Sequence, residues 1–541
     1  MSLVKNVGTI GGLTAVSRVF GFARDMLLAR VLGAGLAADA FQLAFTLPNT
    51  FRRLFAEGAF SVAFVPLYSR ALHGSDGKPG SEEAAERFAN DVLAVFVWVL
   101  TAFSALAMLA MPAIVWILAS EFQSIPGKFE LAVTLSRITF PYLGLISLVA
   151  MLSGLLNARS RFGPGAAAPI LLNIALISSL GMGWYLRERG GTDITVATTL
   201  AVGVSMAGLL QLAYLGWATR RAGVKLKISF PRLTPEVKRL GALILPATFG
   251  AGIYQISQFV DTFFATSLEQ GSLTLLKLAD RLNQMPLGIV GIALGTAILP
   301  MLARHIHESN GPEAQRLQAN AFEVGTLLTL PAAAALAVCA PAFVTAFFVG
   351  GKFTPADGAI MANIVVALVV GLPAYVIVKI LNPGFFARED TRTPVITAVI
   401  SLSFNIALNL YVVRRFGIVG LAGATAASAT LNCLLLYAIL HRRGWFRFTL
   451  KLAGRVARQL IATAAMAAAL WWAMPLMATR YGGNVFERVW SLGALVSLGL
   501  GVFFGVAIAI GALDRELLGQ LRRKRKPTPE RVTRIEAEGG D

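Results

Sequence analysis

The dominant pattern along the chain is a succession of long apolar runs separated by short polar segments. A membrane-spanning helix needs about 20 mostly apolar residues, and runs of this length recur along the whole chain. Backbone groups cannot stay unpaired in lipid, so such runs predict helices. We therefore expect an all-α polytopic membrane protein with about fourteen transmembrane helices. The expected spans are 8–32, 37–68, 89–119, 131–157, 166–186, 195–219, 238–267, 273–303, 317–348, 358–386, 394–414, 418–440, 455–478 and 488–512.

Composition supports a membrane protein. Of the 541 residues, 56% are hydrophobic and 14% are charged, whereas soluble domains carry about 25% charged residues. Cys339 and Cys433 both lie in apolar runs, so neither a disulfide framework nor a metal cluster is expected. The first apolar run has no convincing cleavage site, and we interpret it as a retained helix.

Basic residues are distributed unevenly between the loops. The net charge is +19, but Lys and Arg cluster in short loops such as 220–239 and 442–458 and in the tail 522–526. This placement follows the positive-inside rule and does not indicate a nucleic-acid partner. The more basic set of loops predicts an inner-membrane protein with both termini in the cytoplasm, which requires an even number of spans.

Two short motifs recur at nearly the same offset. Residues 64–67 (FVPL) resemble 298–301 (ILPM), and residues 172–176 (LNIAL) resemble 404–408 (FNIAL). Chance similarity between apolar segments is the alternative, but two matches at corresponding places favour duplication of a six-helix unit. Two such units with a substrate site between them are a common transporter plan. The expected divisions are an N-lobe at 1–221, a C-lobe at 222–443, two further helices within 444–514 and a basic cytoplasmic tail at 515–541.

Motifs for catalysis are absent from the sequence. It has no Walker-type phosphate loop, no Gly-x-Ser-x-Gly and no His-Glu-x-x-His, so we expect neither an enzyme nor direct use of ATP. His305 and His307 could bind a metal, but histidines at predicted helix ends are more often simply solvated. His73 and His441 also lie in predicted cytoplasmic segments. We expect no cofactor other than a possible Na⁺.

Charges inside the spans carry the strongest functional signal, because they are costly in lipid. Arg18 and Arg24 are six residues apart, which places them within about 120° on one helix. Asp25 could neutralise only one of them. Excess arginine in a cavity predicts an anionic ligand, and guanidinium groups suit phosphate oxygens. The other charged residues inside the spans are Asp39, Arg52, Arg53, Glu57, Lys277, Asp280, Arg281 and Lys379. Pro48, Asn49 and Pro286 lie beside them in the same spans.

Two of these features have structural alternatives. Arg52 and Arg53 could reach the membrane interface or pair with Glu57 one helical turn away. Pro48 and Pro286 lie in matching spans of the two expected halves. They predict bent helices that line a cavity, although proline is also tolerated in membrane helices without a function.

Oxygen-bearing residues in the second half suggest a cation site. Asn405 and Asn409 are four residues apart and share one helix face. Thr425 and Asp261 could add oxygen ligands, and one carboxylate would balance one Na⁺. Hydrogen bonding between helices is the alternative interpretation, since Asn and Thr commonly bond across membrane helices.

Several segments in both expected halves form a specific signature. They are 17–25 (SRVFGFARD), 38–41 (ADAF), 47–49 (LPN), 52–60 (RRLFAEGAF), 281–282 (RL), 286–288 (PLG), 293–296 (ALGT) and 383–388 (PGFFAR). In these segments the chain resembles the MurJ (MviN) lipid II flippases, and the resemblance extends to the two additional helices.

The resemblance implies a fold and a substrate. The fold is that of the multidrug/oligosaccharidyl-lipid/polysaccharide (MOP) exporter superfamily, with two six-helix lobes around a central cavity. The substrate is undecaprenyl-diphosphate-linked disaccharide-pentapeptide, and the last two helices are associated with a groove for its lipid tail. Membrane lipids and other cell-wall synthesis proteins are further expected partners. The implied substrate-binding residues are Arg18, Arg24, Arg52 and Arg281, with Asp39 as an associated acidic position and Asp25, Asn49, Arg53 and Glu57 as neighbouring candidates.

The expected function is therefore a flippase that moves lipid II from the cytoplasmic to the periplasmic leaflet by alternating access. Another MOP exporter, of a lipid-linked oligosaccharide or a drug, is the first alternative and predicts fewer cavity arginines. A membrane glycosyltransferase would need a catalytic carboxylate on a large periplasmic loop, and the predicted periplasmic loops are short. A non-transporting scaffold would not need arginines at membrane depth.

Overall fold

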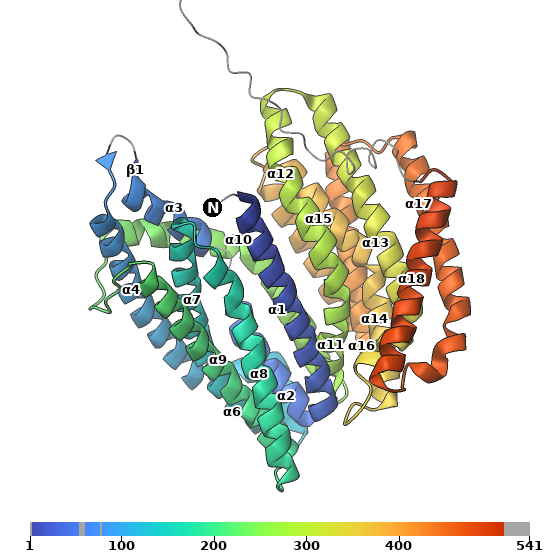
Figure 1. Ribbon diagram of the computed structural model, residues 1–541, viewed down its shortest axis with the longest axis horizontal. Helices are drawn as coiled ribbons and strands as arrows, with labels where there is room; N and C mark the ends of the chain where they lie inside the picture. The colour runs from blue at the N-terminus through green and yellow to red at the C-terminus, as the bar shows by residue number, and fades with distance from the viewer. Residues whose placement is uncertain (1–2, 53–59, 76–77, 513–541) are drawn as a thin grey trace, which may run out of the picture.

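The computed structural model describes residues 3–52, 60–75 and 78–512. The chain forms two bundles of helices that converge at one end and diverge at the other (Figure 1). The first helix begins and the last helix ends at the diverging end, which is the upper end in Figure 1. Arg53 and Glu57 lie outside the described residues.

The first bundle, here called the N-terminal lobe, comprises α1 to α9 and a two-stranded antiparallel hairpin. Its elements are α1 (Leu3–Leu32), α2 (Leu36–Arg52), α3 (Phe60–His73), β1 (Gly74–Ser75), β2 (Lys78–Pro79), α4 (Glu82–Leu109), α5 (Met111–Ala119), the 3₁₀ helix η2 (Ser120–Ser124), α6 (Lys128–Thr139), α7 (Pro141–Ala158), α8 (Gly163–Glu188) and α9 (Asp193–Arg221).

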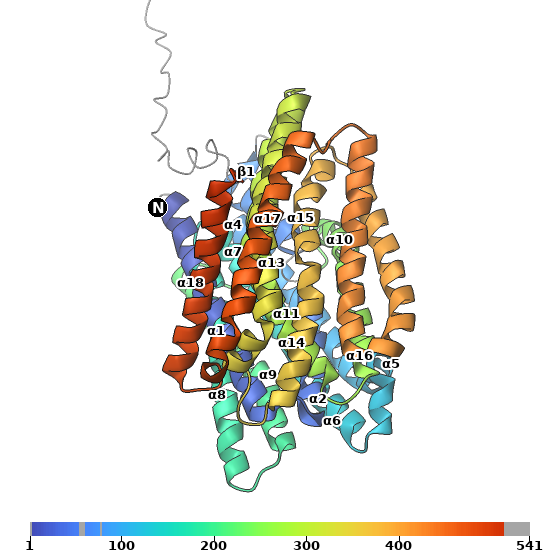
Figure 2. The ribbon, with the colours of Figure 1, turned by 90° about the vertical axis from the view of Figure 1, so that its right-hand side faces the viewer.

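The second bundle, here called the C-terminal lobe, comprises α10 to α16, and α17 and α18 pack against the outer side of α13 (Figure 2). Within α16, Gly417 has a positive φ of 55° and separates two straight helices that correspond to two expected spans. The elements are α10 (Pro235–Thr266), α11 (Ser272–Pro286), the π-helical turn η3 (Leu287–Gly291), α12 (Ile292–His307), α13 (Gly311–Phe347), α14 (Pro355–Val370), α15 (Leu372–Phe386), α16 (Arg392–Arg442), α17 (Leu450–Ala473), the 3₁₀ helix η4 (Pro475–Arg480) and α18 (Val485–Ala509).

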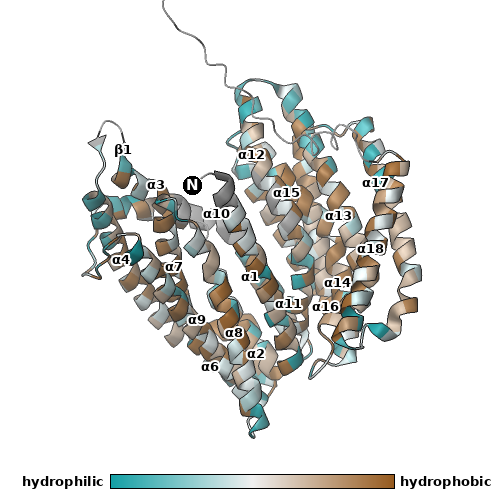
Figure 3. Cartoon of the chain, in the orientation of Figure 1, coloured by the Kyte–Doolittle hydropathy of each residue, from teal (hydrophilic) through white to brown (hydrophobic). Residues whose placement is uncertain are grey.

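The helices have the dimensions and surface of a membrane protein. Within the described part of the chain, nine helical segments are long and apolar enough to cross a bilayer. Hydrophilic residues gather at the two ends of the bundles and hydrophobic residues lie between them (Figure 3). Large apolar side chains such as Leu109, Trp471 and Trp472 are exposed on the outside, where lipid rather than water would solvate them. The fold is thus an all-α polytopic membrane fold, and the count of fourteen spans stays a prediction.

Polar side chains cap the N-termini of several helices at the hydrophilic ends of the bundles. Thr354 and Asp357 form a reciprocal capping box at the start of α14, and Asn484 and Glu487 form another at the start of α18. Such boxes satisfy backbone N–H groups that have no partner inside the helix. Together they fix where these apolar helices begin.

Prolines and helix junctions lie at corresponding places in the two lobes. The α2 helix contains Pro48, and α11 ends at Pro286 and gives way to the π-helical turn η3. A proline removes one backbone donor and crowds the preceding turn, which explains the local change of geometry. Further along, α6 and α7 meet at Phe140, and α14 and α15 meet at Gly371. The two lobes thus share a pattern of continuous and broken helices.

Candidate functional site

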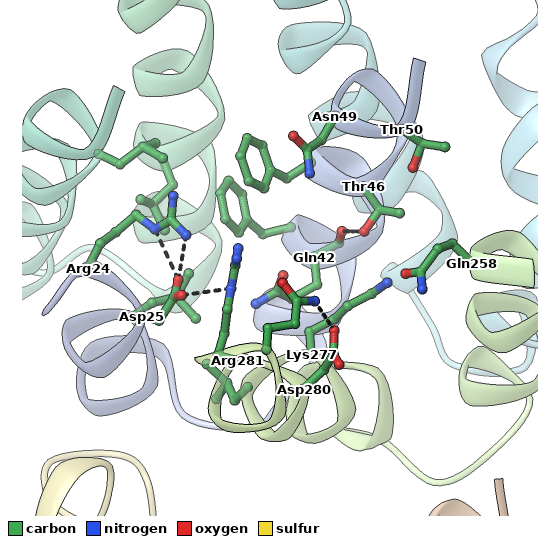
Figure 4. Close-up of a pocket in the computed structure, with 17 residues that line it drawn as sticks. Arg24, Asp25, Gln42, Thr46, Asn49, Thr50, Gln258, Lys277, Asp280 and Arg281 are labelled. Carbon is green, nitrogen blue, oxygen red and sulfur yellow. Dashed lines mark hydrogen bonds and ion pairs between the residues drawn. The ribbon is translucent and has the colours of Figure 1, made fainter. Parts of the chain in front are cut away.

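A polar pocket lies between the two lobes, with walls from α1 and α2 on one side and α10 and α11 on the other (Figure 4). The lining is completed by the apolar side chains of Leu28, Phe41, Phe45, Leu176, Leu200 and Leu278. The polar residues that line the pocket are Arg24, Asp25, Gln42, Thr46, Asn49, Thr50, Gln258, Lys277, Asp280, Arg281 and Gln284.

Two arginines from different lobes share one carboxylate in this pocket. Arg24 donates from Nε and Nη2 to Asp25 Oδ1 at 3.0 and 2.7 Å. Arg281, on α11, contacts Asp25 Oδ2 through its Nε at 2.9 Å. Arg24 and Asp25 are buried, whereas the side chain of Arg281 is 38% exposed. The sequence predicted that Asp25 would neutralise a single arginine of its own helix. Instead, its two oxygens connect the lobes.

Asn173 accepts a hydrogen bond from the remaining nitrogen of the Arg24 guanidinium, Nη1. Its Oδ1 accepts from Arg24 Nη1 at 3.0 Å, and its Nδ2 donates to the carbonyl of Ser17 at 3.0 Å. The side chain of Asn173 also lies against Gly21 of α1, where a Cβ would be in ordinary van der Waals contact with Asn173 Nδ2 at 3.5 Å. Sequence reasoning used Asn173 only as part of the 172–176 repeat. Its place opposite Arg24 was missed because no pattern in the sequence reports which helices pack together.

The pocket has a mixed electrostatic character with a cationic excess. Three cations, Arg24, Arg281 and Lys277, face two carboxylates, Asp25 and Asp280. Asp280 accepts a short hydrogen bond from the amide of Gln284 one turn further along α11. Two guanidinium forks on a single carboxylate offer more donors than that carboxylate has lone pairs. The arrangement favours binding of an additional anion with several oxygens.

Arg18 and Arg52 are placed near this pocket but do not line it. The guanidinium of Arg18 lies against Gly288 in η3, since a Cβ on that glycine would come within 2.5 Å of Arg18 Nη1. Arg52 donates from Nε to Asn49 Oδ1 at 3.1 Å, so Asn49, which does line the pocket, orients Arg52. Of the four predicted arginines, the structure brings Arg24 and Arg281 together.

Asp39 lies outside the pocket, in a buried contact at the converging end of the lobes. Its carboxylate accepts from the backbone N–H groups of Gly271 and Thr274 at 2.7 and 3.0 Å and from Thr274 Oγ1 at 2.8 Å. Lys128 Nζ pairs with the same carboxylate at 2.9 Å and lies over the ring of Phe122. A carboxylate at the N-terminus of α11 is stabilised by the helix dipole. Asp39 therefore joins the N-terminal lobe to the start of the helix that carries Arg281.

A second, exposed contact between the lobes lies beyond Asp39. Lys352 Nζ pairs with Asp193 Oδ1 at 2.5 Å, and both side chains are more than a third exposed. Arg30 donates to the carbonyl of Ala346 at the end of α13 at 3.2 Å. Surface ion pairs of this kind contribute little, so the buried Asp39 contact dominates at this end.

The predicted cation ligands form two hydrogen-bonded pairs in the C-terminal lobe. Thr425 Oγ1 donates to Asp261 Oδ1 at 3.3 Å, and Asn409 Nδ2 donates to Asn405 Oδ1 at 3.0 Å. The hydrogen bond from Ser428 to the carbonyl of Ser401 sets the register of the two halves of α16. Among the described residues, no three His, Cys, Asp or Glu side chains are grouped as metal ligands, so a cation here would need amide and hydroxyl oxygens besides the carboxylate of Asp261.

An apolar groove lies on the opposite side of α13 from the pocket helices. It is formed by α13, α17 and α18, and its lining is almost entirely hydrophobic. An ion pair between the partly exposed Arg455 and the buried Glu323, at 2.6 Å, joins α17 to α13. The groove is lined by Leu327, Leu328, Pro331, Ala332, Ala335, Cys339, Phe343, Met466, Leu470, Leu495, Val496, Gly499, Leu500, Phe503 and Phe504.

The fold is similar to solved structures of membrane transporters. One, described as "Lipid II flippase MurJ, inward closed conformation", superposes with a TM-score of 0.74 at 24% identity and covers 94% of this chain and 99% of that one. An inward-facing multidrug resistance MATE family transporter of the MOP superfamily has a TM-score of 0.66 at 14% identity, over 79% and 94% of the two chains. These similarities concern the fold.

Sequence similarity is higher and covers the whole chain. A probable lipid II flippase MurJ of Rhizobium meliloti (strain 1021) is 43% identical over the full length of both proteins. The lipid II flippase MurJ of Burkholderia cenocepacia is 32% identical over 94% of this chain and 98% of that protein. The family model described as "Lipid II flippase MurJ" matches residues 28–491. The chain therefore belongs to the MurJ family of lipid II flippases.

Proposed function

We propose that this protein moves lipid II, undecaprenyl-diphosphate-linked disaccharide-pentapeptide, from the cytoplasmic to the periplasmic leaflet. The observation that carries the proposal is the contact of Arg24 and Arg281 with Asp25, because it places two guanidinium groups from different lobes around one anionic group. The family gives the substrate, and this contact gives the chemistry that would hold its diphosphate.

In this proposal Asp25 occupies the place of the substrate anion when the pocket holds none. A diphosphate has more acceptor oxygens and more charge than one carboxylate, so it competes for both guanidinium forks. Arg24 is fixed by Asn173, whereas the more exposed Arg281 has room to reorient. An anion held by both arginines would tie the two lobes together and couple substrate binding to their relative position.

The proposed cycle is alternating access between the two lobes. The lobes converge where Asp39 binds the start of α11 (Figure 1). Opening the pocket at this end requires the loss of those hydrogen bonds and of the Lys128 ion pair. The bound head group would leave on that side, which we assign to the periplasm.

The polyprenyl tail would remain outside the pocket. The groove between α13, α17 and α18 offers an apolar surface with almost no polar lining. Burial of apolar tail atoms there is favourable in the same way as contact with lipid. This arrangement separates recognition of the charged head group from accommodation of the tail.

The orientation of the chain is part of the proposal. Both termini and the basic loop between α9 and α10 are assigned to the cytoplasm on the basis of their Lys and Arg content. A membrane-impermeant thiol reagent added to intact cells should not label a Ser229→Cys variant until the membrane is permeabilised. Labelling of intact cells at the permeabilised level would reverse the assignment.

A second candidate function is export of another lipid-linked oligosaccharide or a drug. The fold is shared with MATE transporters, and the pocket contains amides and carboxylates besides its arginines. This candidate predicts transport that does not require a diphosphate. We propose a secondary-type transporter in either case, because the sequence has no ATP-binding loop.

Depletion of the protein in cells tests the proposal directly. Lipid II should accumulate in the cytoplasmic leaflet, so that its head group becomes inaccessible to a periplasmic lipid II-cleaving enzyme. Expression of the wild-type chain should restore cleavage, whereas the Arg24→Ala chain at equal membrane abundance should not. Normal lipid II cleavage in depleted cells, with no other flippase active, would support the second candidate instead.

A further inference from the structure

Two arginines from different lobes meet at one backbone carbonyl at the converging end of the molecule. Arg30, in the last turn of α1, donates from Nη2 to the carbonyl oxygen of Ala346 at 3.2 Å. Arg488, near the start of α18, donates from Nη1 to the same oxygen, also at 3.2 Å. The positive charges of the two guanidinium groups repel each other. The structure therefore holds two like charges together across the junction between the lobes.

Backbone groups alone stabilise this pair of arginines. Arg488 donates its other nitrogens to the carbonyls of Gly483 and Gly482 at 2.7 and 3.2 Å. Arg30 Nε is buried without a hydrogen-bond partner. Among the described residues, neither guanidinium forms an ion pair with a carboxylate. Carbonyls at the end of α13 offset part of the charge through the helix dipole, but one neutral donor would be enough to satisfy the Ala346 carbonyl.

Two carboxylates near the pair are already engaged. Lys352, whose backbone N–H donates to the carbonyl of Arg30 at 2.8 Å, pairs with Asp193 through its ammonium group. Arg187 approaches the same carboxylate at 3.7 Å. Glu487 takes part in the capping box of α18. Cations thus outnumber carboxylates at this end, although it is the end assigned to the periplasm, where the positive-inside rule leaves few basic residues.

The start of α18 lies at the level of lipid head groups. Val485 and Phe486 are each 77% exposed, and Trp490 is 50% exposed. Arg480 lies over the ring of Trp490 at 5.2 Å. Exposed apolar side chains at the end of a spanning helix, with a tryptophan among them, are typical of the boundary between hydrocarbon and head groups. Lipid phosphates therefore lie at about the depth of Arg488.

The apolar groove between α13, α17 and α18 leads to the same place. Along α13 its lining extends from Leu327 to Phe343, which is about 24 Å at 1.5 Å per residue. Ala346 follows Phe343 by less than one turn, and Arg488 precedes the groove residue Leu495 by two turns of α18. A chain that fills the groove would place a phosphate at its end within reach of both arginines.

We propose that Arg30 and Arg488 form a second anion site, which binds the diphosphate of a polyprenyl lipid on the periplasmic side while its chain lies in the groove. Diphosphate oxygens form charge-assisted hydrogen bonds with guanidinium groups, and these are stronger than bonds to a neutral carbonyl. A single groove suits a single chain. The inference rests on the proposed function for the identity of the lipid, but the presence of an anion site does not.

This site would hold the lipid after its head group has left the pocket. Arg30 belongs to the N-terminal lobe and Arg488 to the C-terminal lobe. A diphosphate bound by both replaces their repulsion with attraction to a common anion. Binding therefore stabilises the lobes in contact at the converging end.

The first test measures binding of undecaprenyl diphosphate to the purified full-length protein by native mass spectrometry. The background is Arg24→Ala with Arg281→Ala, so that the pocket does not contribute. Adding Arg30→Gln or Arg488→Gln should weaken binding at least about tenfold. Arg480→Gln is the matched control, because it removes the same charge from the same end and should leave binding unchanged.

The second test identifies the ligand in the same background with Arg30 and Arg488 intact. Undecaprenyl diphosphate should bind at least about tenfold more tightly than phosphatidylglycerol or inorganic pyrophosphate. Ala332→Phe, which places a ring in the groove, should weaken undecaprenyl diphosphate and leave pyrophosphate unchanged. This variant leaves both arginines in place, so it keeps the inference testable if Arg488→Gln does not fold.

Three results would overturn the inference: binding that survives both arginine substitutions, an equal loss in Arg480→Gln, or equally tight binding of phosphatidylglycerol. The measurements involve no transport and no pocket arginines, so they can succeed even if the protein does not flip lipid II. Conversely, normal transfer of lipid II by a chain whose binding is insensitive to Arg30→Gln and Arg488→Gln would refute only the second site.

Discussion

The polar centres of the two lobes occupy corresponding places but have opposite charge. In the N-terminal lobe, Asn173 of the 172–176 repeat contacts the cation Arg24 on the first helix of that lobe. In the C-terminal lobe, Asn405 of the matching 404–408 repeat lies at about the level of Thr425, which contacts the carboxylate Asp261 on the first helix of that lobe. The two repeats thus place an asparagine at corresponding positions, in one lobe against a cation and in the other at the level of a buried carboxylate.

This difference suggests that the two lobes, which share one fold, bind ions of opposite charge. A lobe with fixed guanidinium groups suits an anionic head group, and a lobe with a single buried carboxylate suits a cation. The α11 helix belongs to the C-terminal lobe, but its Arg281 reaches Asp25 of the other lobe. Its N-terminus binds Asp39 at the converging end, so this one helix carries two of the polar contacts between the lobes.

Loss of a pocket arginine should have the largest effect. Arg24→Ala and Arg281→Ala each remove charge-assisted hydrogen bonds worth about 1.5–3 kcal/mol apiece. We expect them to abolish complementation of a depleted strain, and Arg24→Lys and Arg281→Lys to be impaired because lysine lacks the planar fork.

The measurement is growth at native expression with membrane abundance quantified in parallel. Arg304→Ala is the matched control, since Arg304 is an exposed arginine that pairs with Glu308 one turn away. Normal growth with both Arg24→Ala and Arg281→Ala would show that the two lobes do not cooperate in holding the substrate.

The next largest effect is expected at the Asp39 contact. Asp39→Asn leaves Lys128 buried without its counter-ion, and breaking a buried pair in this way costs about 3–5 kcal/mol. The converging end of the lobes should open more often. A Thr46→Cys reporter in the pocket, in a chain without Cys339 and Cys433, should then react several-fold faster with an impermeant thiol reagent in intact cells.

Asp193→Asn is the control for this experiment. It removes the exposed pair with Lys352, which should contribute less than about 1 kcal/mol, so labelling should stay near the wild-type rate. If both variants label alike, the buried and the exposed contacts have equal weight and Asp39 has no special role in separating the lobes.

The sequence predicted the helices and the charged residues of the pocket. It could not predict which of these residues contact each other, because the sequence pattern does not specify how the helices pack. Apolar run length predicted the helices, and the cost of charge in lipid singled out Arg24 and Arg281. The pairing of Arg281 with Asp25 could not be predicted, because the residues are far apart in the chain and nothing in either span specifies the packing of α11 against α1. Asp39 was singled out as a charge inside a span and as the acidic position that the resemblance implies, but its bond to the start of α11 depends on tertiary contact alone.

The membrane potential should have a smaller effect, of several-fold. The pocket lining carries three cations against two carboxylates, and a bound diphosphate reverses the sign of the moving charge. Outward transfer of negative charge gains about 2.3 kcal/mol per charge per 100 mV. In proteoliposomes, an inside-negative potential should accelerate transfer of lipid II away from the negative side. An unchanged rate with ion gradients held constant would mean that no net charge crosses the field.

The smallest effects are expected when Asn173 and Asn405 are replaced in turn, which tests the difference between the lobes most directly. Asn173→Ala removes one of the acceptors of Arg24 and the bond to Ser17, each worth about 1 kcal/mol. Undecaprenyl diphosphate should therefore bind several-fold more weakly, while the affinity for Na⁺ should remain. Asn405→Ala leaves Arg24 untouched and should weaken Na⁺ binding without changing affinity for the diphosphate. Titration of the two ligands against the two variants gives four affinities. Equal losses for both ligands in either variant would mean that the lobes are not specialised, and that the opposite charges beside Asn173 and Asn405 reflect helix packing rather than ion recognition.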